Sequence, residues 1–217
     1  MDLLEKLANN KGTVSSALGK ELAKEVLDGK TDLLDEALAL VCFRLEDKSK
    51  RNIRAGAAKI IEIVAEKQSN LISEHLEDLL PALEAAEAQT KWMIIRTMGF
   101  CARENPEIAK KALPFARRYI YEKTDGQLCL AGAADLYLGD YGEISAEATK
   151  EVFPILLDST NNIINNEHDW IMEAFMKIGK HLTQEEKKMV LSFCEQFKDH
   201  PKKATQGRVR KLEKIYS

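Results

Sequence analysis

Apolar residues recur every three or four positions along most of the chain, in segments separated by short polar turns. The segment 31–47, for example, has apolar residues at positions 33, 34, 37, 38, 41 and 45 after a Thr-Asp start. This spacing places them on one face of an α-helix, and the alternating runs typical of strands are nearly absent. The pattern predicts helices over 13–28, 31–47, 49–67, 69–87, 89–104, 105–123, 126–139, 145–160, 165–181, 183–200 and 203–215.

The connections between these helices are short and carry turn residues, such as Gly29 and the sequences ENP, TDG and GDYGE. A domain boundary usually falls in a longer flexible linker, and none is visible. We therefore expect one domain over residues 1–217. Residues 1–30 would form an atypical N-terminal capping pair, and residues 199–217 a C-terminal capping helix.

Three prolines interrupt otherwise helical segments in similar surroundings: Pro81 in LLPAL, Pro114 in ALPFA and Pro154 in VFPIL. A proline inside a helix removes a backbone hydrogen bond and costs ~3 kcal/mol. Each proline precedes an equivalent position of the next helix by 15 or 16 residues. We predict that each lies in the first helix of a pair, where a bend or break lets that helix curve around its neighbour.

A second recurring feature supports helix pairs as the repeating unit. RAGAAKII at 54–61 and LAGAADLY at 130–137 share the sequence AGAA at an offset of 76 residues, twice 38, and IRTMGFCA at 95–102 takes the place between them. A period near 38 residues with two helices is typical of a helical solenoid. Each pair then buries its apolar face against its neighbours.

These features resemble the HEAT-repeat family: a proline in the first helix, an aspartate near the turn, and an aliphatic-arginine pair in the second helix. The matching segments are LLPAL…IIR, which ends at Arg96, NIR, which ends at Arg54 after Asp47, LPFARRY…TDGQ, which contains Asp125, and, more weakly, Val209–Arg210. The resemblance covers about residues 31–217.

The sequence departs from the family pattern at three positions: Leu130 and Ile171 replace the expected arginine, and Ala39 replaces the expected proline. The resemblance implies an all-α protein, a right-handed α-α superhelix of about six antiparallel helix pairs. Families of this class serve many functions, so fold alone does not assign one.

Arg54, Arg96 and Arg210 occupy equivalent places in this register. One interpretation is a cationic ladder on the inner, concave face of the superhelix. The other, which the resemblance implies and which we favour, is that each arginine pairs with an aspartate of its own or the adjacent repeat. Arginine suits such pairing because its planar fork binds a carboxylate through two hydrogen bonds.

Trp92, Arg96, Gly99 and Arg103 follow one stripe of a single helix, and the remaining faces of that helix carry large apolar residues. The stripe is therefore the face expected to reach solvent. A tryptophan with two arginines is typical of a binding hot spot. The competing interpretation is that Arg96 stacks on Trp92 as ordinary surface packing.

A second stripe, with Trp170, Glu173 and Lys177, lies on the equivalent helix two repeats later, and Asp135 belongs to the helix between them. If both stripes face inward, they form a groove with aromatic and mixed-charge walls. Such a groove would suit a protein or peptide, so we predict partner-binding roles for Trp92, Arg96, Arg103, Asp135, Trp170 and Glu173.

Charge and composition narrow the possible partners. The chain has 45% hydrophobic and 31% charged residues, a net charge of −3 and a pI of about 5.9, which argues against a dedicated nucleic-acid-binding protein. The charge is uneven: residues 198–214 hold seven Lys or Arg against two acids, and residues 140–173 hold eight acids against one Lys. The basic end could bind an acidic partner or nucleic-acid phosphates.

Other sequence features point to an intracellular protein without redox or metal chemistry. Cys42, Cys101, Cys129 and Cys194 are far apart within apolar patterns, so we expect reduced core thiols. The stretch MDLLEKLANN has acidic residues and no long apolar run, so we do not expect it to be a signal peptide. No apolar run reaches the ~18 residues of a membrane span. We therefore expect a cytoplasmic protein that does not bind membranes.

Candidate chemistry is sparse. His75, His168 and His181 each stand near carboxylates without a second histidine four residues away, so we interpret them as solvated surface residues rather than metal ligands. No nucleotide-binding or nucleophile motif is present. We expect no catalytic residues, no cofactor and no metal.

Two hypotheses of function follow. The first is a non-catalytic scaffold that binds a protein or peptide on its concave face. The alternative, which rests on resemblance, is a DNA-binding or DNA-repair protein of the HEAT-like alkylpurine DNA glycosylase type, with Asp135, or Asp169 beside Trp170, and Trp92 as candidate residues. The acidic pI and the acidic block around these residues count against the alternative.

Overall fold

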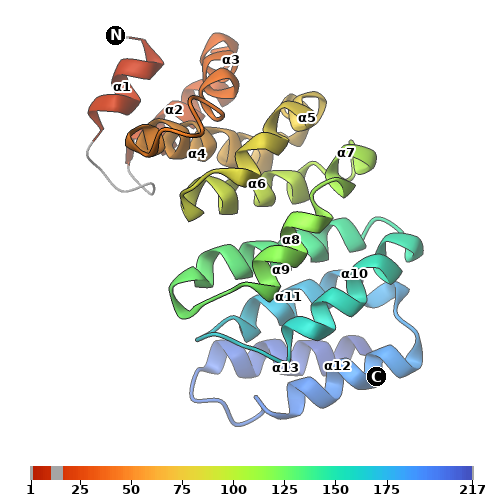
Figure 1. The fold of residues 1–217 in the computed structure, drawn as a ribbon. Helices are drawn as coiled ribbons and strands as arrows, with labels where there is room; N and C mark the ends of the chain where they lie inside the picture. Colours follow the sequence, from red (N-terminus) through yellow and green to blue (C-terminus); the bar gives the residue numbers. More distant parts are fainter. Residues whose placement is uncertain (1, 11–16, 217) are drawn as a thin grey trace. The chain divides into compact units, whose positions relative to one another are not determined.

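The computed structural model describes residues 2–10 and 17–216, and within them the protein is all-α with no strand (Figure 1). The start of the helix predicted over 13–28 and the ends of both predicted caps lie outside these residues. The α-helices are α1 (Leu3–Asn9), α2 (Ala17–Leu27), α3 (Thr31–Leu40), α4 (Arg51–Lys67), α5 (Leu76–Leu79), α6 (Ala88–Phe100), α7 (Pro106–Lys110), α8 (Leu113–Tyr121), α9 (Leu128–Gly142), α10 (Ala146–Ser159), α11 (His168–Ile178), α12 (Gln184–Glu195) and α13 (Lys203–Tyr216).

Short 3₁₀ segments join several of these helices: η1 (Lys48–Lys50), η2 (Ser69–Leu71), η3 (Ser73–His75), η4 (Leu80–Glu84), η5 (Asp125–Gln127) and η6 (Gly179–His181). None of the helices in the described ranges is long and apolar enough to cross a membrane.

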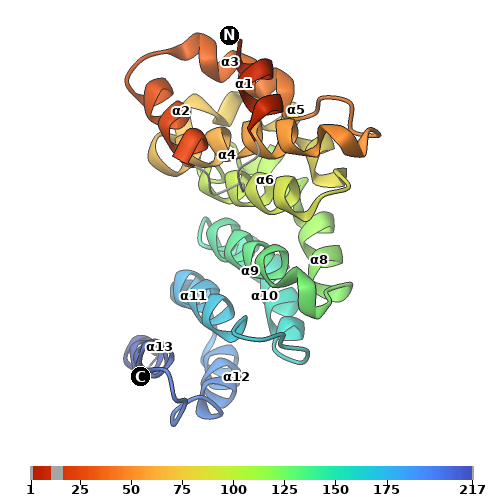
Figure 2. The ribbon, with the colours of Figure 1, turned by 90° about the vertical axis from the view of Figure 1, so that its left-hand side faces the viewer.

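The chain divides into two compact units, residues 1–112 and 113–217. In the first unit α4 packs between α2 and α6, while α3 covers α4 and η4 covers α6 (Figure 1). In the second unit α11 packs between α9 and α13, and α8, α10 and α12 form a second layer against them (Figure 2). The single continuous domain expected from the short connections stays a prediction.

Local sequence explains several helix starts. Asn105 precedes Pro106 at the start of α7, and its side chain accepts a hydrogen bond from the Ile108 backbone N–H. At the start of α10 the Ser145 side chain accepts one from the Ala148 backbone N–H. Thr183 and Glu186 form a reciprocal capping box at the start of α12. Each of these bonds satisfies an N–H group that has no partner within its helix.

The three prolines differ in their surroundings. Pro81 lies in the first turn of η4, and Pro114 is the second residue of α8, directly after a break between α7 and α8. The predicted break is observed at Pro114, whereas at Pro81 the chain passes from α5 to η4 with no residue between them. Little is lost at Pro114, because an N–H in a first turn has no helical partner. Only Pro154 lies inside a continuous helix, α10.

The recurring AGAA sequence has a packing reason. A Cβ atom at Gly56 would lie 2.6 Å from Leu7 Cδ2, and one at Gly132 would overlap the ring of Trp170. In both copies the missing side chain makes room for a large side chain from a neighbouring helix. The glycine of the motif therefore sets how closely adjacent helices pack.

Each unit contains one buried ion pair that connects two successive parts of the chain. Arg54 is fully buried on α4 and donates to both carboxylate oxygens of Glu87, at 2.8 and 2.7 Å. Lys123, which follows α8, donates to both oxygens of Glu167 at 2.8 Å. Glu87 and Glu167 each stand directly before the first residue of a helix, α6 and α11.

The contacts of Arg54 correct our expectation of an aspartate partner. Its acidic partner is Glu87, and its Nη1 donates to the backbone carbonyls of Phe43, Arg44 and Asp47. The Asp47 carboxylate instead accepts from the Ser49 backbone N–H. Arg96 is half-buried and Arg210 is exposed, so the three arginines do not share one environment.

Side-chain contacts between sequence-distant elements recur at similar separations. In the first unit Arg54–Glu87, Lys111–Glu77 and Ser69–Glu104 span 33, 34 and 35 residues. In the second unit Arg208–Glu173, Thr205–Asp169 and Lys177–Asp140 span 35, 36 and 37 residues. These six contacts thus span 33–37 residues, whereas the buried Lys123–Glu167 pair spans 44 residues.

Two expectations about single residues are wrong. Cys129 is exposed, whereas Cys101 and Cys194 are buried and Cys42 is half-buried; all four are free thiols. His168 is buried rather than solvated, because its ring stacks on Phe197 with centroids 4.5 Å apart.

Removing one member of a buried ion pair should lower the free energy of unfolding far more than removing both members. We expect Arg54→Met to lower the free energy of unfolding by about 3–5 kcal/mol, since it leaves Glu87 buried without its cation. The Arg54→Met/Glu87→Met double variant should regain a large part of that loss. Urea unfolding followed by circular dichroism measures both, and equal losses in the two variants would contradict this account.

The glycine at the close approach should tolerate no side chain. Gly132→Ala is expected to destabilise the protein by about 1–3 kcal/mol, since the new methyl group displaces the Trp170 ring. The matched control is Gly207→Ala in α13, whose new Cβ would meet no atom within 4 Å. Replacing this helical glycine with alanine should raise the free energy of unfolding by about 0.5–1 kcal/mol. Thermal melts that shift in the same direction for both variants would refute the packing argument.

Candidate functional site

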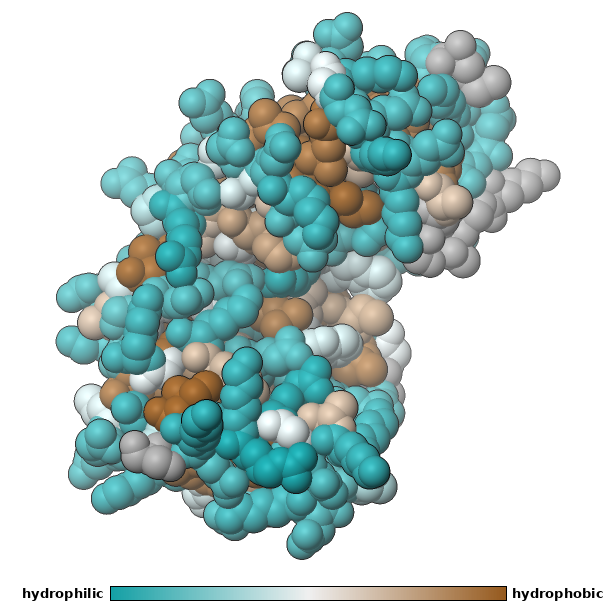
Figure 3. All heavy atoms as spheres, turned by 180° about the vertical axis from the view of Figure 1, so that it is seen from behind, coloured by the Kyte–Doolittle hydropathy of each residue, from teal (hydrophilic) through white to brown (hydrophobic). Residues whose placement is uncertain are grey.

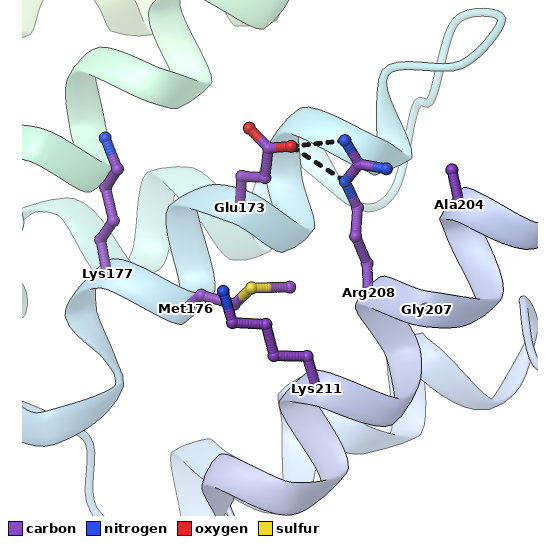
Figure 4. A pocket seen from close by; sticks show the side chains of 7 residues that line it. All are labelled: Glu173, Met176, Lys177, Ala204, Gly207, Arg208 and Lys211. Carbon is purple, nitrogen blue, oxygen red and sulfur yellow. Dashed lines mark hydrogen bonds and ion pairs between the residues drawn. The ribbon is translucent and has the colours of Figure 1, made fainter.

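A surface depression of the second unit lies between α11 and α13, and we call it the α11–α13 groove (Figure 4). It consists of two adjacent cavities of about 450 and 530 Å³ that share Met176, Lys177 and Lys211. The full lining is Glu143, Glu173, Met176, Lys177, Gly179, Lys180, Lys187, Ala204, Gly207, Arg208, Lys211 and Ile215.

One wall of the groove is fixed by a charged network. Arg208 on α13 donates from Nε and Nη2 to the same Glu173 oxygen, at 2.9 and 2.5 Å (Figure 4). Its Nη1 lies 3.7 Å from Asp169, which also accepts a hydrogen bond from Thr205 at 2.8 Å. The network joins α11 to α13 and holds the guanidinium in one orientation.

The lysines of the groove fall into two kinds. Lys177 pairs with Asp140 on α9, and the Lys187 ammonium lies 5.8 Å from the centroid of the Tyr216 ring. Lys180 and Lys211 are exposed, and neither forms an ion pair within the described part of the chain. In Figure 4 Lys211 extends from α13 beside Met176 of α11. Two ammonium groups are thus available to a ligand.

The stripe predicted on α6 has one defined aromatic contact. Trp92 and Arg96 are half-buried and Arg103 is exposed, whereas Gly99 is buried. The Arg96 guanidinium lies 4.3 Å from the centroid of the Phe100 ring, four residues further along α6. Phe100 is therefore one aromatic partner of Arg96.

The other predicted residues belong to the second unit and separate into three environments. Glu173 lines the α11–α13 groove, and Trp170 is half-buried where it covers Gly132. Asp135 is fully buried, so our assignment of it to a partner-binding surface is wrong. The regular spacing places Asp135 on α9, but α9 is covered by α8, α10 and α11, which leaves its middle no exposed face.

Asp135 belongs to a buried polar cluster beside the Lys123–Glu167 pair. Neither of its carboxyl oxygens makes a hydrogen bond of regular geometry. Burial raises the pKa of Asp135 well above its usual range, and the Glu167 carboxylate adds to this effect while Lys123 opposes it. Burial therefore favours the neutral form of this carboxyl group.

The surroundings of several chemically reactive side chains are defined in the described residues. No group of three or more His, Cys, Asp or Glu side chains among them could hold a metal ion. Burial raises the pKa of the Cys101 and Cys194 thiols to about 12, which suppresses the reactive thiolate. Asp169 is already engaged by Thr205 and Arg208.

Comparison of the chain with protein-family models, curated proteins and solved structures finds no match.

The sequence reasoning missed most of the groove. Glu173 was the one lining residue among our predicted contacts, whereas Met176, Lys180 and Lys211 were not singled out. The basic block at residues 198–214 could have pointed to Arg208 and Lys211, but not to Met176 or Lys180. Their convergence with α11 depends on helix packing, which a one-dimensional pattern does not specify.

Neutralising Asp135 should make the stability less dependent on pH. A raised pKa means that the folded state keeps a proton that the unfolded state releases, so stability is full below the ordinary aspartate pKa of about 3.9 and falls as pH rises toward the folded value. Asp135→Asn has the same shape without the charge. We expect its melting temperature at pH 8 to rise by about 4 °C or more, which corresponds to ~1 kcal/mol in a unit of this size.

The control for this experiment is Asp199→Asn, which alters an exposed aspartate. Thermal melts between pH 4 and pH 9 should flatten for Asp135→Asn alone. Parallel profiles for the wild type and Asp135→Asn would show that Asp135 does not stay protonated in the folded protein.

Proposed function

We propose that the protein is a non-catalytic, HEAT-like helical-repeat scaffold that binds a protein or peptide. Its architecture would be a right-handed superhelix of about six antiparallel helix pairs. Three observations support a repeat: the shared AGAA glycine packing, the two glutamates that precede α6 and α11, and side-chain contacts that return after 33–37 residues in both units. Contacts of this kind are those of stacked neighbouring repeats.

The observation that carries the binding function is the α11–α13 groove. Its lining comes mainly from α11 and α13, with additional residues after α9, in η6 and on α12. It combines charged side chains with the apolar Met176 and Ile215. Ligand sites typically combine apolar surface with a few placed polar groups in this way. On the face drawn in Figure 3 hydrophilic side chains predominate and hydrophobic ones form separate patches, so a broad apolar docking surface is not favoured there.

The DNA-repair alternative receives less support. A catalytic carboxylate must come within hydrogen-bond reach of its substrate. Asp135 is fully buried, and Asp169 already accepts from Thr205. Trp170 covers Gly132 and is only partly accessible to a base.

Site-specific photocrosslinking tests the proposed function with the full chain. A photoreactive phenylalanine analogue at Ala204, an exposed position in the groove, should yield a crosslinked protein in an extract of the source cells. The same group at Met189, exposed on α12 and outside the groove lining, is the control. The proposal fails if crosslinks are equal at both positions, or if the groove position crosslinks only nucleic acid.

A further inference from the structure

The structure leads us to infer a ligand chemistry for the α11–α13 groove, an inference that rests on the proposed binding function. We propose that the groove binds an acidic peptide segment, in which aspartate or glutamate side chains flank an aliphatic residue. The cations of the groove would bind the carboxylates, and its apolar floor would receive the aliphatic side chain.

Charge is the first argument. Five cations line the groove, Lys177, Lys180, Lys187, Arg208 and Lys211, against the two acids Glu143 and Glu173. Glu173 forms an ion pair with Arg208, and Lys177 forms one with Asp140 on α9. Lys180 in η6 and Lys211 on α13 therefore hold two positive charges that form no ion pair within the described part of the chain. A ligand with two spaced carboxylates would pair with these two lysines and give charge complementarity.

The second argument is the apolar surface between the charges. Met176 lies at the point where the two cavities meet, and Ile215 is 41% exposed at the far end of the second cavity. Methionine adapts to differently shaped partners because its side chain is flexible and polarisable. Contact between this exposed isoleucine and an aliphatic residue of the ligand would remove apolar surface from water and so favour binding.

A peptide fits these observations better than a nucleic acid. Single-stranded nucleic acids are bound through bases stacked on aromatic rings in a uniformly positive channel. The groove lining contains no aromatic residue and includes two carboxylates. The nearby Tyr216 is buried, and its hydroxyl donates to the Phe175 carbonyl. Mixed charge with an apolar floor matches an acidic peptide.

Selection from a random 12-residue peptide library, displayed on phage and panned against the full chain, tests the inference without a known partner. The selected peptides should be enriched in Asp and Glu together with Leu, Ile, Val or Met, relative to the unselected library. The absence of any enrichment, or enrichment without acidic residues, would overturn the inference.

Variants then assign the selected peptides to the groove. For the highest-ranked peptide, labelled with fluorescein, Lys180→Gln/Lys211→Gln should weaken binding by about tenfold, which corresponds to ~1.4 kcal/mol. Lys188→Gln/Lys202→Gln removes two exposed lysines outside the groove and should change the Kd by less than a factor of two. Equal effects of the two double variants would mean that the peptide responds only to overall charge.

Steric and nucleic-acid controls complete the experiment. Gly207→Gln places a side chain in the open part of the first cavity and should also weaken peptide binding. If a 12-nucleotide DNA strand binds more tightly than the peptide and depends on Lys180 and Lys211, the assignment to a peptide is wrong. If photocrosslinking from Ala204 captures a protein while the library yields no acidic peptides, only the inferred ligand chemistry fails. If crosslinking also fails, the proposed function fails with it.

Discussion

Each unit depends on a carboxylate that stands directly before a helix and binds a buried cation from the preceding part of the chain. Glu87 binds Arg54 and Glu167 binds Lys123. A charge without its partner would be very costly at such depth, so helix position, cation position and turn geometry must agree. The backbone carbonyls bound by Arg54 show this dependence directly, since the turn after α3 is shaped around the guanidinium.

The helical content and several helix starts were predictable because they arise from local chemistry. The three-four spacing of apolar residues and the caps at Asn105, Ser145 and Thr183 act within a few residues. The sequence pattern predicted one helix over 105–123, whereas the structure has two, α7 and α8. Pro114 marks the start of the second helix, but we had placed it inside a single one. A proline in a first turn and one inside a helix look alike in sequence, and tertiary packing decides between them.

Prediction of the candidate site was less successful, for a physical reason. Spacing along a helix says which side chains share a face, but not whether other helices cover that face. Asp135 is enclosed while Glu173 lies in the groove, although both were assigned to one surface. Lys123 shows the same limit: where Leu130 replaces the arginine expected by the repeat register, a lysine outside the motif supplies the buried cation.

The two tryptophans have a practical consequence for observing the protein in solution. Trp92 on α6 belongs to the first unit, and Trp170, seated over Gly132, belongs to the second. The sequence contains only these two, so replacing either one with phenylalanine confines tryptophan fluorescence to a single unit. Emission from each variant during denaturation would follow that unit alone, and coincident transitions would identify the whole chain as one cooperative folding unit.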